Sequence, residues 1–314
     1  MYDICAVGEL LIDFTPTPEG NFKPNPGGAP CNFLTSAQKM GAKTAFIGKV
    51  GKDAFGTRLK TVLEEQNVDT KYLKLDERYG TTLAFVHLYP NGDRDFSFYR
   101  KGCADVMLEQ DDIDLELLNQ TKAFHFGSLS FTDEPSRSTV LALLQEAKRK
   151  AILITYDPNY RAPLWHSKTE AISYMRKGFE YADIVKVSDE ELELLTGEKD
   201  FSLGANKLMA FGPKLICVTL GDKGCFYKSN SGLEGTVSGV KANQVDTTGA
   251  GDTFFGALVS QIVALGQPVE RIDQAELETM ILTANTAAAI CIEGYGGIPS
   301  IPTKSAVLNR LTQR

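Results

Sequence analysis

The sequence is poor in the side chains that build metal clusters and disulfide frameworks. Its 314 residues include three histidines and six cysteines, and no two cysteines form a CxxC pair. The cysteines are Cys5, Cys31, Cys103, Cys217, Cys225 and Cys291, most of them in apolar segments where a thiol packs as a small core residue. This usage predicts neither a zinc site nor a disulfide framework, and it favours a cytoplasmic, reducing location.

Basic charge and long apolar runs are scarce as well. The net charge is −7, whereas a nucleic-acid footprint needs a basic face. No apolar run approaches the ~18 residues that span a bilayer. The first 14 residues lack the basic start and the cleavage site of a signal peptide. We therefore expect no nucleic-acid partner and no membrane partner.

Several catalytic and nucleotide-binding motifs are also missing from the sequence. It has no GxxxxGK[ST] loop, no HRD or DFG set, no GxGxxG after the first strand-like segment, and no HExxH or GxSxG element. These absences count against a P-loop enzyme, a protein kinase, a dinucleotide-dependent dehydrogenase, a zinc protease and a serine hydrolase.

Apolar strand-like runs alternate with helix-like segments along most of the chain. We predict strands at 4–8, 43–50, 123–129, 152–157, 184–188, 215–220 and 236–245, and helices at 32–40, 55–66, 135–150, 189–196, 254–265 and 275–292. Strands that are almost continuously apolar and separated by helices indicate a mainly parallel sheet with helices on both faces. The predicted fold is therefore a three-layer α/β/α, Rossmann-like domain.

Two segments interrupt this alternation. Residues 15–26 are rich in proline and glycine, and residues 81–100 show the alternation of a β-hairpin around the turn Pro90-Asn91-Gly92-Asp93. A hairpin inserted into an α/β layer has to pack elsewhere, either as a flap over a pocket or as a decoration of the domain.

The most specific feature of the chain is the run VDTTGAGDT at residues 245–253. Gly249-Ala250-Gly251 falls at a strand-to-helix turn, whose N–H groups can converge on an anion. Asp252 follows directly. A carboxylate beside an anion site repels the anion, unless it serves to take a proton from the attacking group. Taken alone, an aspartate in a first helical turn is more often a cap that compensates the helix dipole.

The string DTTGAGD resembles the signature of the ribokinase-like sugar kinases, also called the phosphofructokinase-B type. The resemblance implies that Asp252 is the catalytic base and that Gly249, Ala250 and Gly251 form its anion hole. It also implies ATP and Mg²⁺ as cofactors, and one domain over residues 1–314 with a small β-sheet lid formed by about 14–26 and 81–101.

The N-terminal part carries a second motif of this family. Asp13 ends the first strand-like segment, at the sheet edge where ligands bind, although a lone aspartate there is more often a cap or turn residue. Gly27-Gly28-Ala29-Pro30-Cys31-Asn32 resembles the family's GGxxxN string, in which paired glycines permit close approach and the amide can donate and accept. The resemblance implies that Asp13, Gly27, Gly28 and Asn32 bind the sugar.

Further similarities lie between and after these motifs. The string DPNYR at 157–161 resembles a DxNxR element, which implies that Asn159 lines the sugar path and Arg161 the phosphoryl path. Residues 186–191 stand where many relatives have an NxxE motif that places magnesium and phosphate. Ser188 replaces the asparagine there, which puts that position in doubt, whereas Glu191 matches as an indirect magnesium residue.

The nucleotide side is implied by resemblance alone. The residues expected to bind or flank ATP are Lys186, Ser188, Glu191, Thr219, Gly221, Gly224 and Asn285, together with the loop Gly296-Gly297-Ile298-Pro299-Ser300. Asp246 and Thr248, with carbonyl groups of the loop from Gly296 to Ser300, resemble a potassium site that many relatives carry.

The segments 96–105, 124–128, 156–165 and 186–189 are most similar to the plant and bacterial fructokinase branch, whose acceptor is the 6-hydroxyl of fructose. From the lid we expect Tyr99 and Arg100 to reach the sugar, and lids of this family often pair between protomers, which implies a homodimer. A 2-keto-3-deoxygluconate kinase or a nucleoside kinase remains an alternative within the family. A sugar-binding regulator without activity is the alternative outside the enzymes, and the intact Asp252 counts against it.

Overall fold

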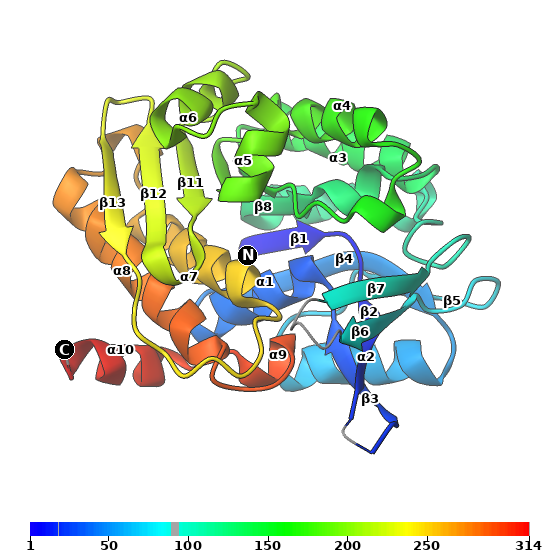
Figure 1. The fold of residues 1–314 in the computed structure, drawn as a ribbon. Coiled ribbons are helices and arrows are strands. Elements are labelled where there is room, and N and C mark those ends of the chain that lie inside the picture. Colours follow the sequence, from blue (N-terminus) through cyan, green and yellow to red (C-terminus); the bar gives the residue numbers. More distant parts are fainter. Residues whose placement is uncertain (18, 89–93, 314) are drawn as a thin grey trace.

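The computed structural model describes residues 1–17, 19–88 and 94–313, and arranges them around a large and a small sheet (Figure 1). Within that range, the large sheet has the strand order β13-β12-β11-β10-β9-β8-β1-β4-β5 and the small sheet the order β3-β2-β6-β7. The strands are β1 (Tyr2–Val7), β2 (Leu11–Pro16), β3 (Phe22–Gly27), β4 (Thr44–Gly51), β5 (Leu73–Asp76), β6 (Leu83–Leu88), β7 (Arg94–Tyr99), β8 (Thr121–Gly127), β9 (Leu153–Asp157), β10 (Ile184–Ser188), β11 (Leu215–Thr219), β12 (Gly224–Ser229) and β13 (Glu234–Ser238).

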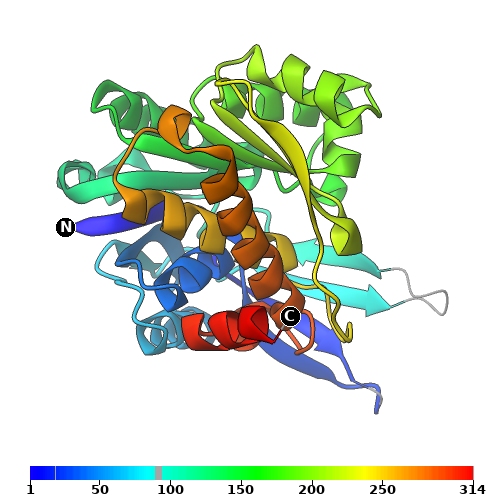
Figure 2. The ribbon, with the colours of Figure 1, turned by 90° about the vertical axis from the view of Figure 1, so that its left-hand side faces the viewer.

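Helices cover both faces of the large sheet, which confirms the predicted three-layer fold (Figure 2). The helices are α1 (Ala29–Lys39), α2 (Ala54–Glu65), α3 (Ser136–Arg149), α4 (Lys168–Phe179), α5 (Asp189–Thr196), α6 (Phe201–Met209), α7 (Ala250–Leu265), α8 (Gln274–Cys291), α9 (Gly297–Ser300) and α10 (Lys304–Thr312). One hydrophobic core lies between the sheet and α1, α2, α7, α8 and α10, and the other between the sheet and α3 to α6. In the described residues, no helix has both the length and the apolar character needed to cross a membrane.

The core of the large sheet is parallel, as predicted, and its β12 and β13 edge is antiparallel. The strand predicted at 236–245 is wrong beyond residue 238. After Ser238 the chain leaves the sheet, and the Val245 N–H donates to the Ile292 carbonyl at 2.8 Å. The apolar residues Val237, Val240 and Val245 therefore belong to a strand end and a connection, which the sequence pattern alone does not separate.

The small sheet is built from the two segments that interrupt the alternation. β6 and β7 pair antiparallel as the predicted hairpin, whereas its predicted turn at residues 90–93 lies outside the described residues. The proline-rich segment supplies the end of β2 and most of β3, and β2 pairs parallel with β6. The expectation that Asp13 ends the first strand is wrong, since β1 ends at Val7 and Asp13 lies in β2. Pro24 and Pro26 are tolerated in β3 because it is an edge strand, where a missing N–H breaks no ladder between two neighbours.

Helices α1 and α7 approach each other closely. A Cβ atom on Gly256 would lie 2.3 Å from the Phe33 carbonyl oxygen, so only glycine permits this approach. The Ser36 hydroxyl donates to the Thr253 carbonyl at 2.7 Å, and the Phe33 ring lies 5.6 Å from that of Phe255. Because α1 and α7 follow the two sequence motifs, this packing brings the motifs together.

We predict that Gly256→Ala destabilises the protein by about 1–3 kcal/mol, because the added methyl group has to push α7 away from α1. The measurement is the free energy of unfolding in urea. Ser260→Ala is the matched control, since the Ser260 hydroxyl bonds to the Ala257 carbonyl of its own helix. If the two variants unfold at the same urea concentration, the close approach of the two helices is not limiting.

Candidate active site

A cleft of about 420 Å³ opens at the carboxyl ends of β1, β9, β10 and β11. Ligands of parallel α/β sheets bind at this edge. Its walls come from the whole length of the chain, namely Glu9, Leu11, Asp13, Gly28, Ala29, Asn32, Phe98, Leu129, Asn159, Arg161, Lys186, Ser188, Glu191, Thr219 and residues 247–252. The structure thus brings most of the predicted site residues into one cavity.

The glycine-rich turn at the start of α7 forms one end of the cleft. Gly249 caps the helix with φ of 77°, a left-handed conformation that glycine adopts without strain. The first turn of a helix leaves N–H groups without helical partners and carries partial positive charge. One of these groups is used within the turn, since the Ala250 N–H donates to the Thr247 carbonyl at 3.2 Å. The geometry fits an anion site, as predicted.

Asp252 lies in the same first turn and lines the cleft. Its Oδ2 accepts a hydrogen bond of 2.8 Å from the Asn32 amide. Burial raises the pKa of the Asp252 carboxyl above its usual range, and the charges of Lys186 and Arg161 and the Asn32 hydrogen bond act in the opposite direction. Asp252 is therefore a carboxylate of increased basicity beside an anion site, which suits a proton acceptor.

Lys186 supplies a cation at the floor of the cleft. Its ammonium group lies 2.9 Å from the Asp157 carboxylate, and both side chains are buried. A Cβ atom on Gly251 would meet the Lys186 Nζ at 2.9 Å, so the ammonium lies directly against the positive end of α7. The Asp157 carboxylate offsets part of this positive charge. Lys186 and the start of α7 still present two positive features to the cleft, which suits a phosphate group.

Asp13 lies in β2, and its carboxylate is packed against the backbone of β3. A Cβ atom on Gly27 would lie 2.1 Å from the Asp13 Oδ2, which explains why a glycine stands there. Burial raises the pKa of Asp13 to about 7, the Arg161 charge lowers it, and the charges of Asp246 and Asp252 raise it further. A buried carboxylate facing a polar cleft is a good acceptor for sugar hydroxyl groups.

Asn159 and Arg161 line the cleft as the DxNxR resemblance implies. Asn159 has a φ of 45°, a left-handed conformation that asparagine tolerates better than most residues. Its N–H donates to the Asp157 Oδ1 at 3.1 Å, which closes the turn after β9.

Ser188 and Glu191 form a capping box at the start of α5. The Ser188 hydroxyl accepts from the Glu191 N–H, and Glu191 Oε2 accepts from the Ser188 N–H at 2.9 Å. Glu191 Oε1 accepts from the Tyr160 N–H at 2.7 Å. Serine therefore replaces the family's asparagine as a helix cap, and both oxygens of Glu191 already hold backbone groups, which fits an indirect role toward a metal.

The cleft contains residues that the sequence did not single out, chiefly Glu9 and Phe98. Glu9 Oε1 accepts from the Ala29 N–H at 3.1 Å and so caps α1. Burial raises the pKa of Glu9 to about 7, which the charge of Arg100 opposes. Glu9 could have been predicted as a site residue, because it is an acidic residue that closely follows an apolar strand. The position of Phe98 on the cleft side of β7 follows from the alternation of side chains along the strand once β6 and β7 are paired.

The structure places Tyr99 and Arg100 outside the cleft, and their contact with the sugar stays a prediction. Arg100 is buried, and its guanidinium donates to Asp105 at 2.7 Å, to the Thr132 hydroxyl and to the Leu129 carbonyl. Tyr99 is 66% exposed, and its ring packs edge-on against Phe85. Both residues line a separate cavity. In the described structure they do not line the cleft, because the Arg100 guanidinium is held in an ion pair with Asp105, five positions further along the chain.

On the predicted nucleotide side, Thr219 lines the cleft, whereas Gly221, Gly224 and Asn285 lie outside it. Gly221 and Gly224 bracket the turn between β11 and β12. The Asn285 amide donates to the Val237 and Ser238 carbonyls at 3.1 and 3.2 Å, so it fixes the end of β13. A direct contact of Asn285 with a base remains a prediction of the family resemblance.

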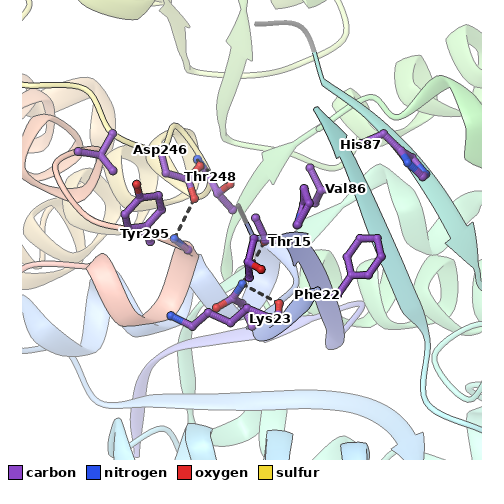
Figure 3. Close-up of a pocket in the computed structure, with 13 residues that line it drawn as sticks. Thr15, Phe22, Lys23, Val86, His87, Asp246, Thr248 and Tyr295 are labelled. Atoms are coloured by element: carbon purple, nitrogen blue, oxygen red, sulfur yellow. Dashed lines mark hydrogen bonds between the residues drawn. The ribbon is translucent and has the colours of Figure 1, made fainter. Parts of the chain in front are cut away.

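A larger cavity of about 1030 Å³ adjoins the cleft at Thr248 and separates the small sheet from the body of the domain. Figure 3 shows Thr15, Lys23 and Val86 on the side of the small sheet, and Asp246, Thr248 and Tyr295 opposite. Asp246 Oδ1 accepts from the Thr248 N–H and hydroxyl, and its Oδ2 from the Gly296 N–H at 2.9 Å. The Ser300 hydroxyl donates to the carbonyls of Gly296 and Gly297. The four predicted potassium-site residues are thus neighbours.

The comparisons with known proteins agree with this geometry. The sequence profile of the pfkB family of carbohydrate kinases matches residues 1–304. The chain is 42% identical to a protein of Arabidopsis thaliana named probable fructokinase-3, over 98% of this chain and 91% of that protein. The fructokinase of Xylella fastidiosa, solved with bound ATP, superposes with a TM-score of 0.92 at 26% identity, covering 99% of this chain and 98% of that one.

A double mutant of the Vibrio cholerae fructokinase, solved with fructose, ADP and a potassium ion, superposes with a TM-score of 0.89 at 29% identity, covering 99% of this chain and 98% of that one. The family match extends over nearly all of the sequence. This chain therefore belongs to the pfkB family of carbohydrate kinases.

Proposed function

We propose that this protein is an ATP-dependent fructokinase, which transfers the γ-phosphoryl group of ATP to the 6-hydroxyl of D-fructose. The observation that carries the proposal is the placement of Asp252 beside the Gly249–Gly251 turn, in one cleft with Asp13. The similarity to proteins named fructokinase, one of them solved with fructose and ADP, supports the choice of substrate.

In the proposed reaction Asp252 accepts the proton of the sugar hydroxyl as that hydroxyl attacks phosphorus. The N–H groups at the start of α7, with Arg161 and Lys186, stabilise the charge of the transferring phosphoryl group. Asp13, Asn159 and the backbone of Gly27 and Gly28 hold the sugar so that its hydroxyl faces Asp252. Catalysis of this kind depends on position and fixed charge, because phosphoryl transfer needs little covalent help from the protein.

The position of Arg100 helps to choose among the substrates of the family. A keto acid such as 2-keto-3-deoxygluconate needs a cation for its carboxylate, and Arg100 and Arg161 are the two arginines predicted near the site. Since Asp105 pairs with Arg100 inside the protein, only Arg161 of that pair lines the cleft. A neutral sugar is therefore the better match.

The metal ions of the proposal differ in how directly the protein would hold them. In the described part of the chain, no group of three or more histidine, cysteine, aspartate or glutamate side chains is arranged for a metal. Mg²⁺ would therefore be held by the nucleotide phosphates, with Glu191 acting indirectly. Potassium fits the oxygen-rich cluster of Asp246, Thr248 and the loop from Gly296 to Ser300, where it would add fixed positive charge near the anion hole.

The small sheet is proposed to be a lid that closes over the sugar and to provide a homodimer contact. Its inner side carries Asp13 and Phe98 into the cleft. Its opposite side carries stacked rings of Phe14 and Phe85, 4.7 Å apart, beside Phe22, which is 45% exposed. Phe14 is covered by Phe55 of α2, whereas Phe22 and Tyr99 are exposed, and exposed apolar rings favour cover by another protein surface. The cytoplasm stays the predicted location.

Asp252→Asn should lower kcat for fructose by roughly 10²–10⁴-fold while fructose and ATP still bind, because the amide cannot take the proton. The measurement is a coupled assay of ADP release at saturating substrates, with calorimetry for binding. The same assay applied to a panel of fructose, ribose, 2-keto-3-deoxygluconate and adenosine tests the substrate. Turnover near the wild-type rate in the variant would refute the role of Asp252 as base, and a preference for another acceptor would refute fructose.

Asp13→Ala should raise the KM for fructose at least tenfold, because hydrogen bonds to a charged group contribute about 1.5–3 kcal/mol each. In the wild type the KM should also rise as the pH falls through about 7, where Asp13 gains its proton. That pH dependence should disappear in the variant. Glu19→Ala, which removes an exposed carboxylate between β2 and β3, is the control. A KM that changes for ATP and not for fructose would place Asp13 on the wrong side of the cleft.

Fructose alone should slow amide hydrogen exchange in β2, β3, β6 and β7, because closure of the lid excludes water from the reacting groups. Peptides from β12 and β13, at the far edge of the large sheet, serve as the internal control. Protection confined to the central sheet, or appearing only with ATP, would show that the small sheet does not respond to sugar. A fixed dimer contact would then be its better description.

A further inference from the structure

The Asn32 side chain contacts the proposed base directly, although the family resemblance assigns this residue to the sugar. Its Nδ2 lies 2.8 Å from the Asp252 Oδ2, across a separation of 220 positions in the sequence. Asn32 is 4% exposed and sits in the first turns of α1. The amide has to present its NH₂ group to Asp252, because a carbonyl oxygen in that place would repel the carboxylate.

Two glycines leave the space that the Asn32 amide occupies. A Cβ atom on Gly297 would lie 2.5 Å from the Asn32 Oδ1, and one on Gly249 would lie 3.4 Å from its Nδ2. The Oδ1 atom is buried and has no hydrogen-bond partner among the described residues. A buried carbonyl without a partner is destabilising, so a side chain needed only for packing would be better without an amide. The hydrogen bond to Asp252 explains why an amide side chain occupies this position.

Charged groups surround Asp252 from several elements. They are Lys186 in β10, Asp157 at the end of β9, Arg161 after β9, Glu191 in α5, Asp13 in β2, and the thiols Cys31 in α1 and Cys291 in α8. Burial raises the pKa of Asp252, while Lys186, Asn32 and Arg161 lower it. Among the three groups that lower the pKa, Asn32 acts through a hydrogen bond and carries no charge of its own, so it can fix the carboxylate without pairing with a phosphate.

We propose that Asn32 is a positioning residue for the reaction, whose amide holds the Asp252 Oδ2 so that Oδ1 meets the acceptor hydroxyl. The proposal rests on the proposed function, because it presumes that Asp252 is the base. It assigns to Asn32 an effect on proton transfer that a sugar ligand would not have. Gly297 supports the same effect from the opposite side by leaving room for the amide.

Asn32→Ala should move the acid limb of the pH profile of kcat upward by about one to two pH units, because a hydrogen bond that favours the ionised carboxylate is lost. The sign follows from the raised pKa of Asp252, which rises further once the donor is removed. The plateau of kcat at high pH should fall about tenfold or more, since the carboxylate is no longer oriented. Ser260→Ala is the matched control: it removes a buried hydroxyl of α7 that donates at 2.9 Å to the Ala257 carbonyl of its own helix, and its acid limb should stay in place.

Gly297→Ala tests the same contact without changing Asn32, since the new methyl group displaces the amide. Its acid limb should move in the same direction, and the double variant should add little to Asn32→Ala. This variant also carries the test if Asn32→Ala does not fold.

A raised KM for fructose with an unmoved acid limb in Asn32→Ala would overturn the proposal and make Asn32 a sugar ligand only. That outcome is separate from failure of the proposed function. If Asp252→Asn is inactive and the acid limb of Asn32→Ala stays in place, only the role of Asn32 falls. If Asp252→Asn keeps its turnover, the base itself is wrong.

Discussion

The close packing of α1 against α7 is the constraint on which the cleft depends. Gly256 lets the helices approach until the Phe33 carbonyl touches the α7 backbone, and the Ser36 hydroxyl fixes their register on Thr253. This register aligns the start of α1, which carries the GGxxxN string, with the start of α7, which carries the anion hole. A shift of one ångström between reacting groups is large on the scale of catalytic geometry, so the packing of two apolar helix faces determines the position of the base.

Buried charge is the second organising feature. The cleft collects the carboxylates of Glu9, Asp13 and Asp252, with Asp157 beneath Lys186. Burial raises the pKa of these carboxyl groups, so their ionised forms are less favourable in the cleft than in water. Positive charge comes from Lys186, Arg161 and the start of α7. Such an arrangement contributes little to the stability of the fold, because buried charges are destabilising unless they are paired. It suits the binding of a polar sugar and a polyanion.

The sequence predicts best those features that are local. The turn at Gly249 and the aspartate that follows it form one motif, and the geometry of a strand-to-helix turn explains both. The layers follow from the alternation of apolar strands and helices. The pairing of Arg100 with Asp105 could not be predicted, because it depends on how the chain turns after β7, which no local pattern shows. The hydrogen bonds from Asn285 to the carbonyls of β13 could not be predicted either, because they depend on how distant segments pack. The contact between Asn32 and Asp252 required knowledge of how two distant helices pack.

The distance of 220 positions between Asn32 and Asp252 also has a consequence for synthesis on the ribosome. The N-terminal strands and α1 emerge long before α7, so a nascent chain carries half of its cleft for most of the time of its translation. Until α7 docks, the apolar face of α1 lacks its partner and is exposed to aggregation or to chaperones. Enzymatic turnover cannot begin before that docking. Activity is therefore a strict reporter of complete folding in this protein, more demanding than the presence of secondary structure.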